Sequence, residues 1–411
     1  MKVKFNYLVL AALFISFTNI LLFAEIKEEN YPNGKTSKRY NVNSENKKTG
    51  DYSEFYESGQ IKIKATYKND LLEGFYNEFL DSGKKTMSVQ FSLGQKNGYC
   101  RFFEKELIVK EEFWINGFLA FPKSISEITR TLASIPKLKT EFIGEWPKDF
   151  KLERFSKTVE ADNIAGLAKL REFRYLCNLP YEDLQLQKEC IAYNLDGLII
   201  FNKLNGITHT PTNPGLEEKV YQSAYIGTSH SNLSNSNRDM SAAVSIERMY
   251  MNDSDKTNID HVGHRRWCLN PSMKVTGFAS DAFYGLMWSS DMSRKKTPEF
   301  EFICYPSTGY FPSTHFNSNY VWSISLNPNL YLSPDKQLVK IVVSSVKDKV
   351  SKELKITYQN IDTQFIGINN CIIFKPDNVS LSPKSRYHVE ITGLKDRSNK
   401  EAKVEYYVEF F

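Results

Sequence analysis

The sequence predicts an α+β protein with three structured parts: an antiparallel β-sheet built from repeats, a central domain of helices and strands, and a C-terminal β-sandwich. Three observations lead to this prediction. Glycines recur at a fixed step in the first quarter, apolar residues recur at helical spacing in the middle, and short alternating segments between turn signals fill the end. Phe and Tyr, which favour sheets, are abundant at 28 and 23 residues.

Length and charge narrow the functional classes. With 411 residues, and about 150 residues as the usual size of one domain, two or three domains are expected. The hydrophobic fraction of 41% is that of a globular chain and excludes a disordered or collagen-like one. The 53 basic and 48 acidic side chains leave a net charge of +5 over the whole length, which does not indicate a nucleic-acid binder.

Residues 1–24 predict a secretory signal peptide. Lys2 and Lys4 precede an apolar run over 7–23, and the small residue Ala24 ends it. An uncleaved membrane anchor is the alternative, because about 17 apolar residues approach the length that spans a bilayer. No later segment is apolar enough to span one. The mature chain is therefore expected in the periplasm, on the cell surface or outside the cell.

Export permits disulfides, and the chain has six cysteines without any Cys-x-x-Cys pair. Cys177 and Cys190 flank the turn at Asn178-Leu179-Pro180, where a disulfide could join two helices. Such a short closed loop would contribute up to about 3 kcal/mol of stability. Structural pairing or free burial is favoured over metal or redox chemistry for the six thiols.

Residues 25–122 contain the repeat. Gly50, Gly74 and Gly98 lie about 24 residues apart, and Gly59 and Gly83 keep the same step. A fixed period of this length indicates stacked units that bury their apolar faces on one another.

Each unit is predicted to be a β-hairpin, because Ile61, Ile63, Ala65 and Tyr67 alternate with polar residues. The stretch 31–118 resembles the MORN-like repeats, a family that forms elongated antiparallel sheets. This resemblance implies a docking surface for a partner, with a spacer as the alternative.

Residues 123–150 are predicted to link the repeat to the central domain. A short helix is expected from Ser124 to Ala133, because Ser124 and Glu127 stand at capping-box spacing. Pro136 and Trp146-Pro147 indicate irregular chain after it.

The central domain, residues 151–305, is predicted to begin with two helices over 158–177 and 182–204, separated by Leu179-Pro180 and ended by Asn205-Gly206. The elements expected after them are a loop rich in serine and asparagine over 228–237, a third helix over 238–251, and strands over 274–278, 283–288 and 299–305.

This order of elements resembles the CAP superfamily of cysteine-rich secretory and pathogenesis-related proteins, in its bacterial SCP-like form. The residues that carry the resemblance are Leu179-Pro180, His209 between threonines, Ser231-Asn232-Leu233, and the run from Gly263-His264-Arg265-Arg266 to Asn270-Pro271. The resemblance implies an α-β-α sandwich with a surface cleft that holds two histidines and two acidic residues, in some members with a divalent metal. It also implies binding of lipids, sterols or protein partners.

By match to the family motif, His209 and His264 are the cleft histidines, and they are also the candidate metal ligands, with zinc as the candidate ion. The acidic partners depart from the family's pattern. Ser231-Asn232 stands where the family has Glu-Asn, and the second acidic position falls near Tyr250, with Glu247 one turn earlier. A partly buried Glu247 would need a partner such as a histidine. A salt bridge to its neighbour Arg248, or exposure to solvent, is the alternative.

A hydrolase is the competing functional class. Ser231, His264 and Asp260 supply the residue types of a catalytic triad, but no Gly-x-Ser-x-Gly elbow accompanies them. We therefore favour binding and assign no catalytic residue.

The remaining polar residues of this stretch are expected in supporting places. His230 and His261 are predicted to be polar loop residues. Arg265 and Arg266 are expected to hydrogen-bond nearby carbonyls or carboxylates, with an anionic ligand as the alternative.

Residues 306–411 are predicted to form the β-sandwich. The segment 320–326 alternates between two faces, and further short strands are expected over 339–343, 356–358, 371–374, 387–391 and 404–408. The stretch 381–394 resembles the end of immunoglobulin-like bacterial modules. This part either binds a ligand or supports the central domain by packing.

The sequence thus predicts an exported bacterial recognition protein that works at the cell envelope or outside the cell. Its expected ligand is a lipid, sterol or protein in the central cleft, and the partner of its repeats is not identified. A metal-dependent or serine hydrolase, and a scaffold that docks through the repeats, are the alternatives.

Overall fold

The computed structural model describes residues 25–237, 240–347 and 350–411. The predicted signal peptide lies outside the described residues, as does the expected start of the third helix at Arg238. The chain divides into two compact units, the first ending at Phe118 and the second running from Leu119 to Phe411. Within the described residues, no helix combines the length and the apolar character needed to cross a membrane.

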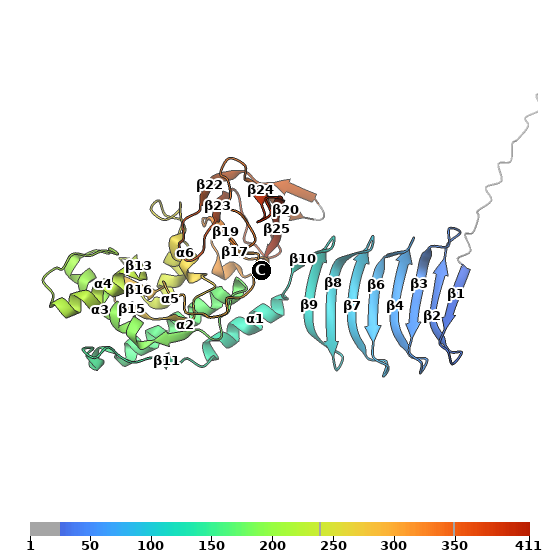
Figure 1. Ribbon diagram of the computed structural model, residues 1–411, viewed down its shortest axis with the longest axis horizontal. Coiled ribbons are helices and arrows are strands. Elements are labelled where there is room, and N and C mark those ends of the chain that lie inside the picture. The colour runs from blue at the N-terminus through green and yellow to red at the C-terminus, as the bar shows by residue number, and fades with distance from the viewer. Residues whose placement is uncertain (1–24, 238–239, 348–349) are drawn as a thin grey trace, which may run out of the picture. The chain divides into compact units, whose positions relative to one another are not determined.

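The first unit is an antiparallel sheet in which strands adjacent in sequence are almost all adjacent in space (Figure 1). The order is β1-β2-β3-β4-β6-β7-β8-β9-β10, with the short β5 beside β4. The strands are β1 Glu25–Asn30, β2 Thr36–Val42, β3 Lys48–Phe55, β4 Ile61–Lys68, β5 Leu71–Leu72, β6 Gly74–Phe79, β7 Lys85–Ser92, β8 Gln95–Glu104, β9 Leu107–Ile115 and β10 Phe118–Phe121.

The repeat of the sequence is accompanied by a hydrogen bond that recurs from one repeat to the next. The Tyr31 hydroxyl donates to the Phe55 carbonyl at 2.6 Å, and one repeat later the Tyr56 hydroxyl donates to the Phe79 carbonyl at 2.8 Å. The glycines Gly50, Gly74 and Gly98 have φ values of 73°, 87° and 121°, a region that side chains with a Cβ rarely adopt. The fixed spacing of these glycines therefore reflects a backbone requirement that recurs in each unit.

The two faces of this sheet differ in chemistry. The register places Tyr52 opposite Ala65 and Val89 opposite Cys100, and all four are at most 6% exposed. Residues of the opposite parity are more exposed and mix polar and aromatic side chains, such as the exposed Phe75 and the cross-strand ion pair of Arg101 Nε with Glu111 Oε2 at 2.6 Å. The apolar row is buried by its neighbours within the sheet, as stacked repeats require.

The second unit begins within β10, and the predicted capped helix follows. The Ser124 side chain accepts the Glu127 backbone N–H at 3.2 Å, so the helix expected from Ser124 begins there. The helices of this unit are α1 Ile125–Ser134, η1 Ile135–Lys137, η2 Leu152–Arg154, α2 Lys157–Leu176, α3 Lys188–Leu204, α4 Glu218–Ser229, α5 Ala242–Val244, the π-helical η3 Ser245–Tyr250, α6 Gly263–Cys268 and η4 Ser313–His315.

Several elements of the central part differ from the prediction: α4 was not expected, and the third helix is divided into α5 and η3. The helix expected from residue 182 begins only at Lys188, because β12 (Gln185–Gln187) pairs in parallel with β11 (Phe142–Ile143) and β14 (Val275–Thr276). The segment 231–235, expected to be loop, is the strand β13 (Ser231–Asn235), which pairs with β16 (Tyr284–Trp288). The polar composition of β13 is compatible with burial because its side chains hydrogen-bond internally.

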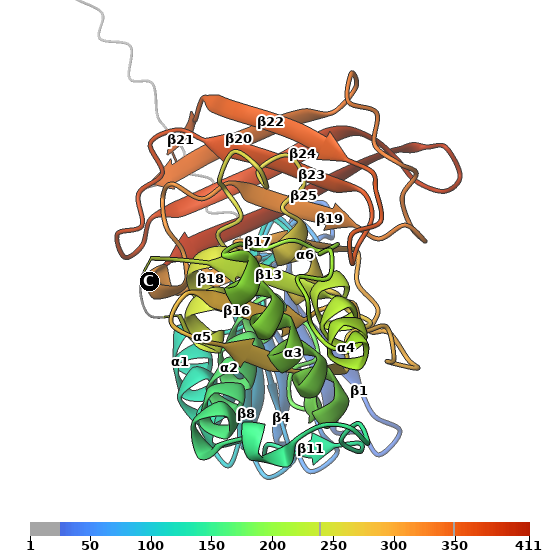
Figure 2. The ribbon, with the colours of Figure 1, turned by 90° about the vertical axis from the view of Figure 1, so that its left-hand side faces the viewer.

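The C-terminal part contains two sheets, as a β-sandwich requires (Figure 2). Their orders are β17-β19-β23-β22 and β18-β25-β24-β20-β21. The strands are β17 Phe302–Tyr305, β18 Gly309–Phe311, β19 Trp322–Leu326, β20 Lys340–Lys347, β21 Val350–Glu353, β22 Ile356–Asp362, β23 Cys371–Pro376, β24 Arg386–Lys395 and β25 Glu401–Phe410. The remaining strand of the central part, β15 (Phe278–Ser280), pairs with β16.

The strand expected over 299–305 was assigned to the central domain, but β17 pairs with β19. It therefore belongs to a C-terminal sheet. One continuous hydrophobic core includes Leu170 of α2, Ile200 of α3, Ile324 of β19 and Tyr406 of β25. The central and C-terminal parts consequently share a single interior.

Buried arginines join these two parts. Arg265 Nη1 donates to the Val321 carbonyl and to Ser323 Oγ, both at 2.9 Å. Arg266 Nη1 lies 2.6 Å from Asp362 Oδ2, and Arg266 Nε donates to the Ile368 carbonyl at 3.0 Å. Both guanidinium groups thus bind carbonyls or a carboxylate, as the sequence predicted.

The proposed pairing of Cys177 with Cys190 is wrong, since all six cysteines are free and buried. The intervening chain is more than a tight turn, because it includes β12. Cys177 directly follows the last residue of α2, whereas Cys190 lies in the first turn of α3, after β12. Burial raises the pKa of the Cys177 thiol to about 12, so this thiol is unreactive.

We expect Arg266→Met to lower the free energy of unfolding by about 3–5 kcal/mol, because the buried Asp362 carboxylate loses its cationic partner. Urea titration monitored by tryptophan fluorescence measures the change. The exposed Arg397→Met is the matched control and should change stability by no more than about 0.5 kcal/mol. Equal, small effects of the two variants would contradict the assigned role of Arg266.

Candidate functional site

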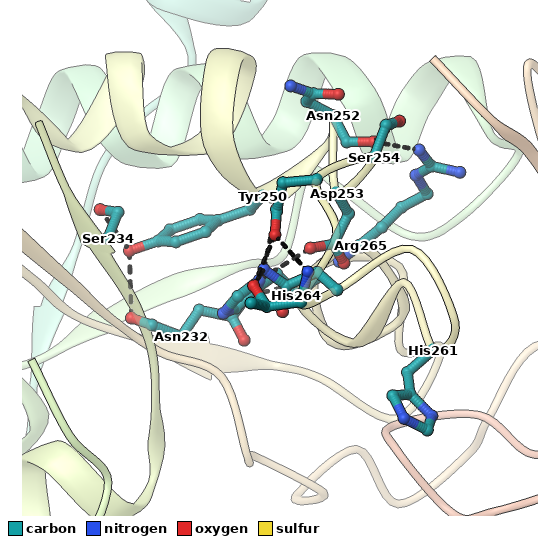
Figure 3. Close-up of polar contacts among 12 residues, drawn as sticks. Asn232, Ser234, Tyr250, Asn252, Asp253, Ser254, His261, His264 and Arg265 are labelled. Carbon is teal, nitrogen blue, oxygen red and sulfur yellow. Dashed lines mark hydrogen bonds and ion pairs between the residues drawn. The ribbon is translucent and has the colours of Figure 1, made fainter.

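A buried carboxylate holds His264 in place. His264 lies in the first turn of α6, and its Nδ1 is 2.8 Å from Asp253 Oδ1. The other oxygen of Asp253 accepts the backbone N–H of Arg265 at 3.1 Å (Figure 3). Asp253 is only 1% exposed. One carboxylate therefore fixes both the imidazole and the start of the helix that carries it.

This contact sets the protonation of His264. Burial alone lowers the pKa of the imidazole, but the negative charge of Asp253 and its hydrogen bond outweigh burial and raise the pKa above its usual value of 6.5. A raised pKa in the folded state stabilises the fold when the imidazole is protonated. That contribution is fully present below pH 6.5 and is lost as the pH rises through the raised pKa.

Two other predicted cleft residues, Asn232 and Tyr250, lie beside His264. Asn232 Nδ2 donates to the His264 carbonyl at 2.9 Å. The Tyr250 ring lies 5.4 Å from the His264 ring, and its hydroxyl donates to the Asn232 carbonyl at 3.0 Å. Both residues are almost fully buried, at 2% and 0% exposure. They therefore position α6 and the imidazole.

His209 is oriented in the same way from another part of the chain. It lies between α3 and α4, and its Nδ1 is 2.9 Å from the Thr228 carbonyl oxygen. A carbonyl only accepts, so this contact places the proton on Nδ1 and leaves Nε2 as the acceptor. In both histidines Nδ1 is engaged, and Nε2 has no hydrogen-bond partner within the described residues.

His209 and His264 line the same two adjoining hollows. The smaller, of about 240 Å³, also has Trp267 and Ile366 in its wall. The larger, of about 420 Å³, has Leu233 in its wall. We call the two hollows together the histidine groove. The fold thus brings together two histidines from distant segments of the chain.

Glu247 is not part of the histidine groove. Its carboxylate lies 3.7 Å from Lys169 Nζ, so its ion-pair partner is neither a histidine nor Arg248. The carboxylate next to His264 comes instead from Asp253, which the sequence analysis missed. Asp253 follows the third helix in an irregular segment, so helical spacing could not point to it.

The residues of the suspected triad are kept apart. Ser231 is 3% exposed and donates to Asn194 Oδ1 at 2.7 Å. Asp260 accepts a hydrogen bond from the Tyr358 hydroxyl. Within the described residues neither side chain is hydrogen-bonded to His264, which excludes a Ser231–His264–Asp260 triad.

The other two histidines of this stretch line the smaller hollow. His230 stacks on Trp288, with ring centroids 5.0 Å apart. His261 Nδ1 lies 3.0 Å from Asp362 Oδ2, and its ring is turned away from His264 (Figure 3). Both extend the wall of the groove with polar rings that are already hydrogen-bonded.

The donor set at the groove suits a metal only in part. Anchoring of Nδ1 by a carbonyl or a carboxylate is the arrangement usual for metal-binding histidines. However, the described residues contain no cluster of three or more His, Cys, Asp or Glu side chains that could hold a metal ion. Zinc sites normally have three or four protein ligands. Water or ligand atoms would have to complete the coordination around His209 and His264.

Comparison with protein families, with curated proteins and with solved structures found no match to this chain.

We expect Asp253→Asn to lower the pKa of His264, because the substitution removes the charge that raises it. The titration of the His264 Hε1 resonance by NMR measures this pKa in both proteins. The Hε1 resonance of His388, which pairs with Glu405 in the C-terminal sheet, should have the same position in both proteins and is the internal control. An unchanged His264 titration would show that Asp253 does not control its protonation.

Proposed function

We propose that this chain is an exported bacterial binding protein of the CAP type whose ligand occupies the histidine groove. The observation that carries the proposal is the matched anchoring of two imidazoles through Nδ1, with both Nε2 atoms left without a partner in the described residues. A site with a few fixed polar groups in a hollow binds a ligand with little loss of side-chain freedom.

The walls of the groove support a partly apolar ligand with a polar head group. Trp267, Ile366 and Met249 supply apolar surface in the walls that also contain the histidines. Lipid, sterol and protein ligands, which the CAP resemblance implies, all combine apolar surface with polar groups. The head group would accept from or donate to the free Nε2 atoms.

The arrangement supports binding better than hydrolysis. A hydrolase of the serine type needs a nucleophile that a base can reach. Ser231 is buried and bonded to Asn194, and all six cysteines are buried thiols. His264 can thus exchange a proton with a ligand. Neither Ser231 nor any of the six cysteines is an activated nucleophile.

Capture from a cell extract tests the proposal. We expect the mature chain to retain lipids or proteins that the His209→Ala/His264→Ala variant does not, because the variant removes both free Nε2 atoms. Mass spectrometry of the retained material provides the comparison. His388→Ala, a histidine paired within a sheet, is the matched control and should retain the same set as the unaltered protein.

If the double variant retains the same set as the unaltered chain, the histidine groove is not the binding site. A chain without residues 25–117 tests the remaining alternative, a scaffold that docks through the repeat sheet. Loss of the captured partner in that chain, with full retention by the histidine variant, would favour a scaffold that docks through the repeat sheet.

We also propose that the groove holds a divalent metal weakly, because both anchored imidazoles leave Nε2 for coordination. Calorimetric titration with Zn²⁺ should show one site per chain that His209→Ala and His264→Ala each remove. The affinity should fall as the pH drops through the raised pKa of His264, since only the neutral ring binds metal. Zn²⁺ binding that neither variant alters would exclude a metal at these residues.

A further inference from the structure

A second cavity lies next to the histidine groove and contains neither His209 nor His264. Its volume is about 730 Å³, and its walls come from η3, from the loop after η3, from the segment 314–320 and from Lys375 of β23. Arg248, Asn252 and Asp255 line both this cavity and the larger hollow of the groove. We call this second hollow the polar cavity.

The walls of the polar cavity are held in place by the protein itself. Ser254 Oγ accepts the backbone N–H of Val321 at 3.0 Å, which fastens the loop after η3 to the start of β19. Asn317 Oδ1 accepts the backbone N–H of Asn319 at 2.9 Å and fixes the opposite wall. Little ordering would therefore be needed when a ligand enters.

Several polar groups that line the cavity remain free. Within the described residues, five lining side chains have no hydrogen-bond or ion-pair partner: Arg248, Asn252, Asn319, Tyr320 and Lys375. They come from three separate segments of the chain and include donors as well as acceptors. This combination suits a ligand that carries many hydrogen-bonding groups.

Charge and polarity disfavour two other ligand classes. The lining contains two cationic side chains, Arg248 and Lys375, and two carboxylates, Glu247 and Asp255, so its formal charge does not favour a phosphate or a polyanion. The one large aliphatic or phenyl side chain in the wall, Phe316, is only 7% exposed. An acyl chain or a sterol would therefore find little apolar surface.

We infer that the polar cavity is a binding site for a neutral oligosaccharide. Hydroxyl and acetamido groups of such a ligand would pair with the free guanidinium, ammonium and amide groups, and the half-buried ring of Tyr320 offers a flat surface for a sugar ring. A volume of about 730 Å³ falls within the usual range for ligand sites. Neither His209 nor His264 lines the polar cavity, so the ligand of this site does not contact the two histidines.

Calorimetry on the mature chain tests this inference with two probes, the hexamer of N-acetylglucosamine and cellohexaose. We expect at least one to bind in a one-to-one ratio. Asn319→Ala and Lys375→Ala should each weaken that binding about two- to tenfold, the usual effect of one lost hydrogen bond. Both substitutions truncate side chains without partners in the described residues, so the fold, checked by circular dichroism, should persist.

Lys400→Ala is the matched control, since Lys400 is exposed and lies outside the polar cavity. It should leave saccharide binding unchanged, as should His209→Ala, which tests the histidine groove separately. Absence of binding by both saccharides would overturn the inference. So would binding that only His209→Ala weakens, and so would binding of a hexaserine peptide in place of both saccharides, which would assign the cavity to a peptide.

Discussion

Burial of Arg265 and Arg266 is the constraint on which the second unit depends. These adjacent guanidinium groups lie between the central helices and the C-terminal sheets, and each is at most 2% exposed. A charge removed from water is tolerated only when hydrogen bonds replace its hydration. The carbonyls of Met251, Val321 and Ile368 provide those bonds, and they come from segments far apart in the chain. The central and C-terminal parts must therefore fold against each other.

The C-terminal part also supports the backbone of the histidine groove. Val262, directly before α6, has φ of 42°, a conformation that a β-branched residue adopts only when its surroundings enforce it. Such backbone strain is of the order of 1–3 kcal/mol. Val262 is fully buried against Val321, Cys371 and Ile373 of the C-terminal part. The C-terminal sandwich thus supports the backbone that presents His264, which is the packing role considered for it from sequence.

The sequence predicted the secondary structure correctly where a single residue type meets a local requirement of the backbone. Ser124 caps α1, and the glycines at Gly50, Gly74 and Gly98 mark positive φ values, so the capped helix and the repeat sheet were both predictable. Helix α4 was not, because it packs closely on α3 through small residues: a Cβ on Gly227 would lie 2.2 Å from the Tyr193 carbonyl oxygen. A helix that buries glycine and alanine shows no stripe of large apolar residues.

The site itself was predictable in part, for a related reason. His209 and His264 are marked by motifs, but their supporting groups are defined by tertiary contacts. Asp253 approaches His264 only because the chain after η3 turns back, and Asp253 itself has φ of 48°. Likewise, Ser231 and Asn232 are buried because their side chains find partners on Asn194 and α6. From sequence, these two residues were predicted to lie in a loop because the segment 228–237 is rich in serine and asparagine.

The loop 251–255 connects the histidine groove and the polar cavity through its own hydrogen bonds. The Met251 and Asn252 carbonyls accept from Arg265, Asp253 binds His264, and Ser254 binds Val321. The side chains of Asn252 and Asp255 line both the polar cavity and the histidine groove. Because four consecutive residues, 251 to 254, are each bonded in this way, a shift of the loop that reshapes the polar cavity must also break contacts that hold the histidine groove. The histidine groove and the polar cavity therefore share one wall, and the guanidinium group of Arg265 holds that wall in place.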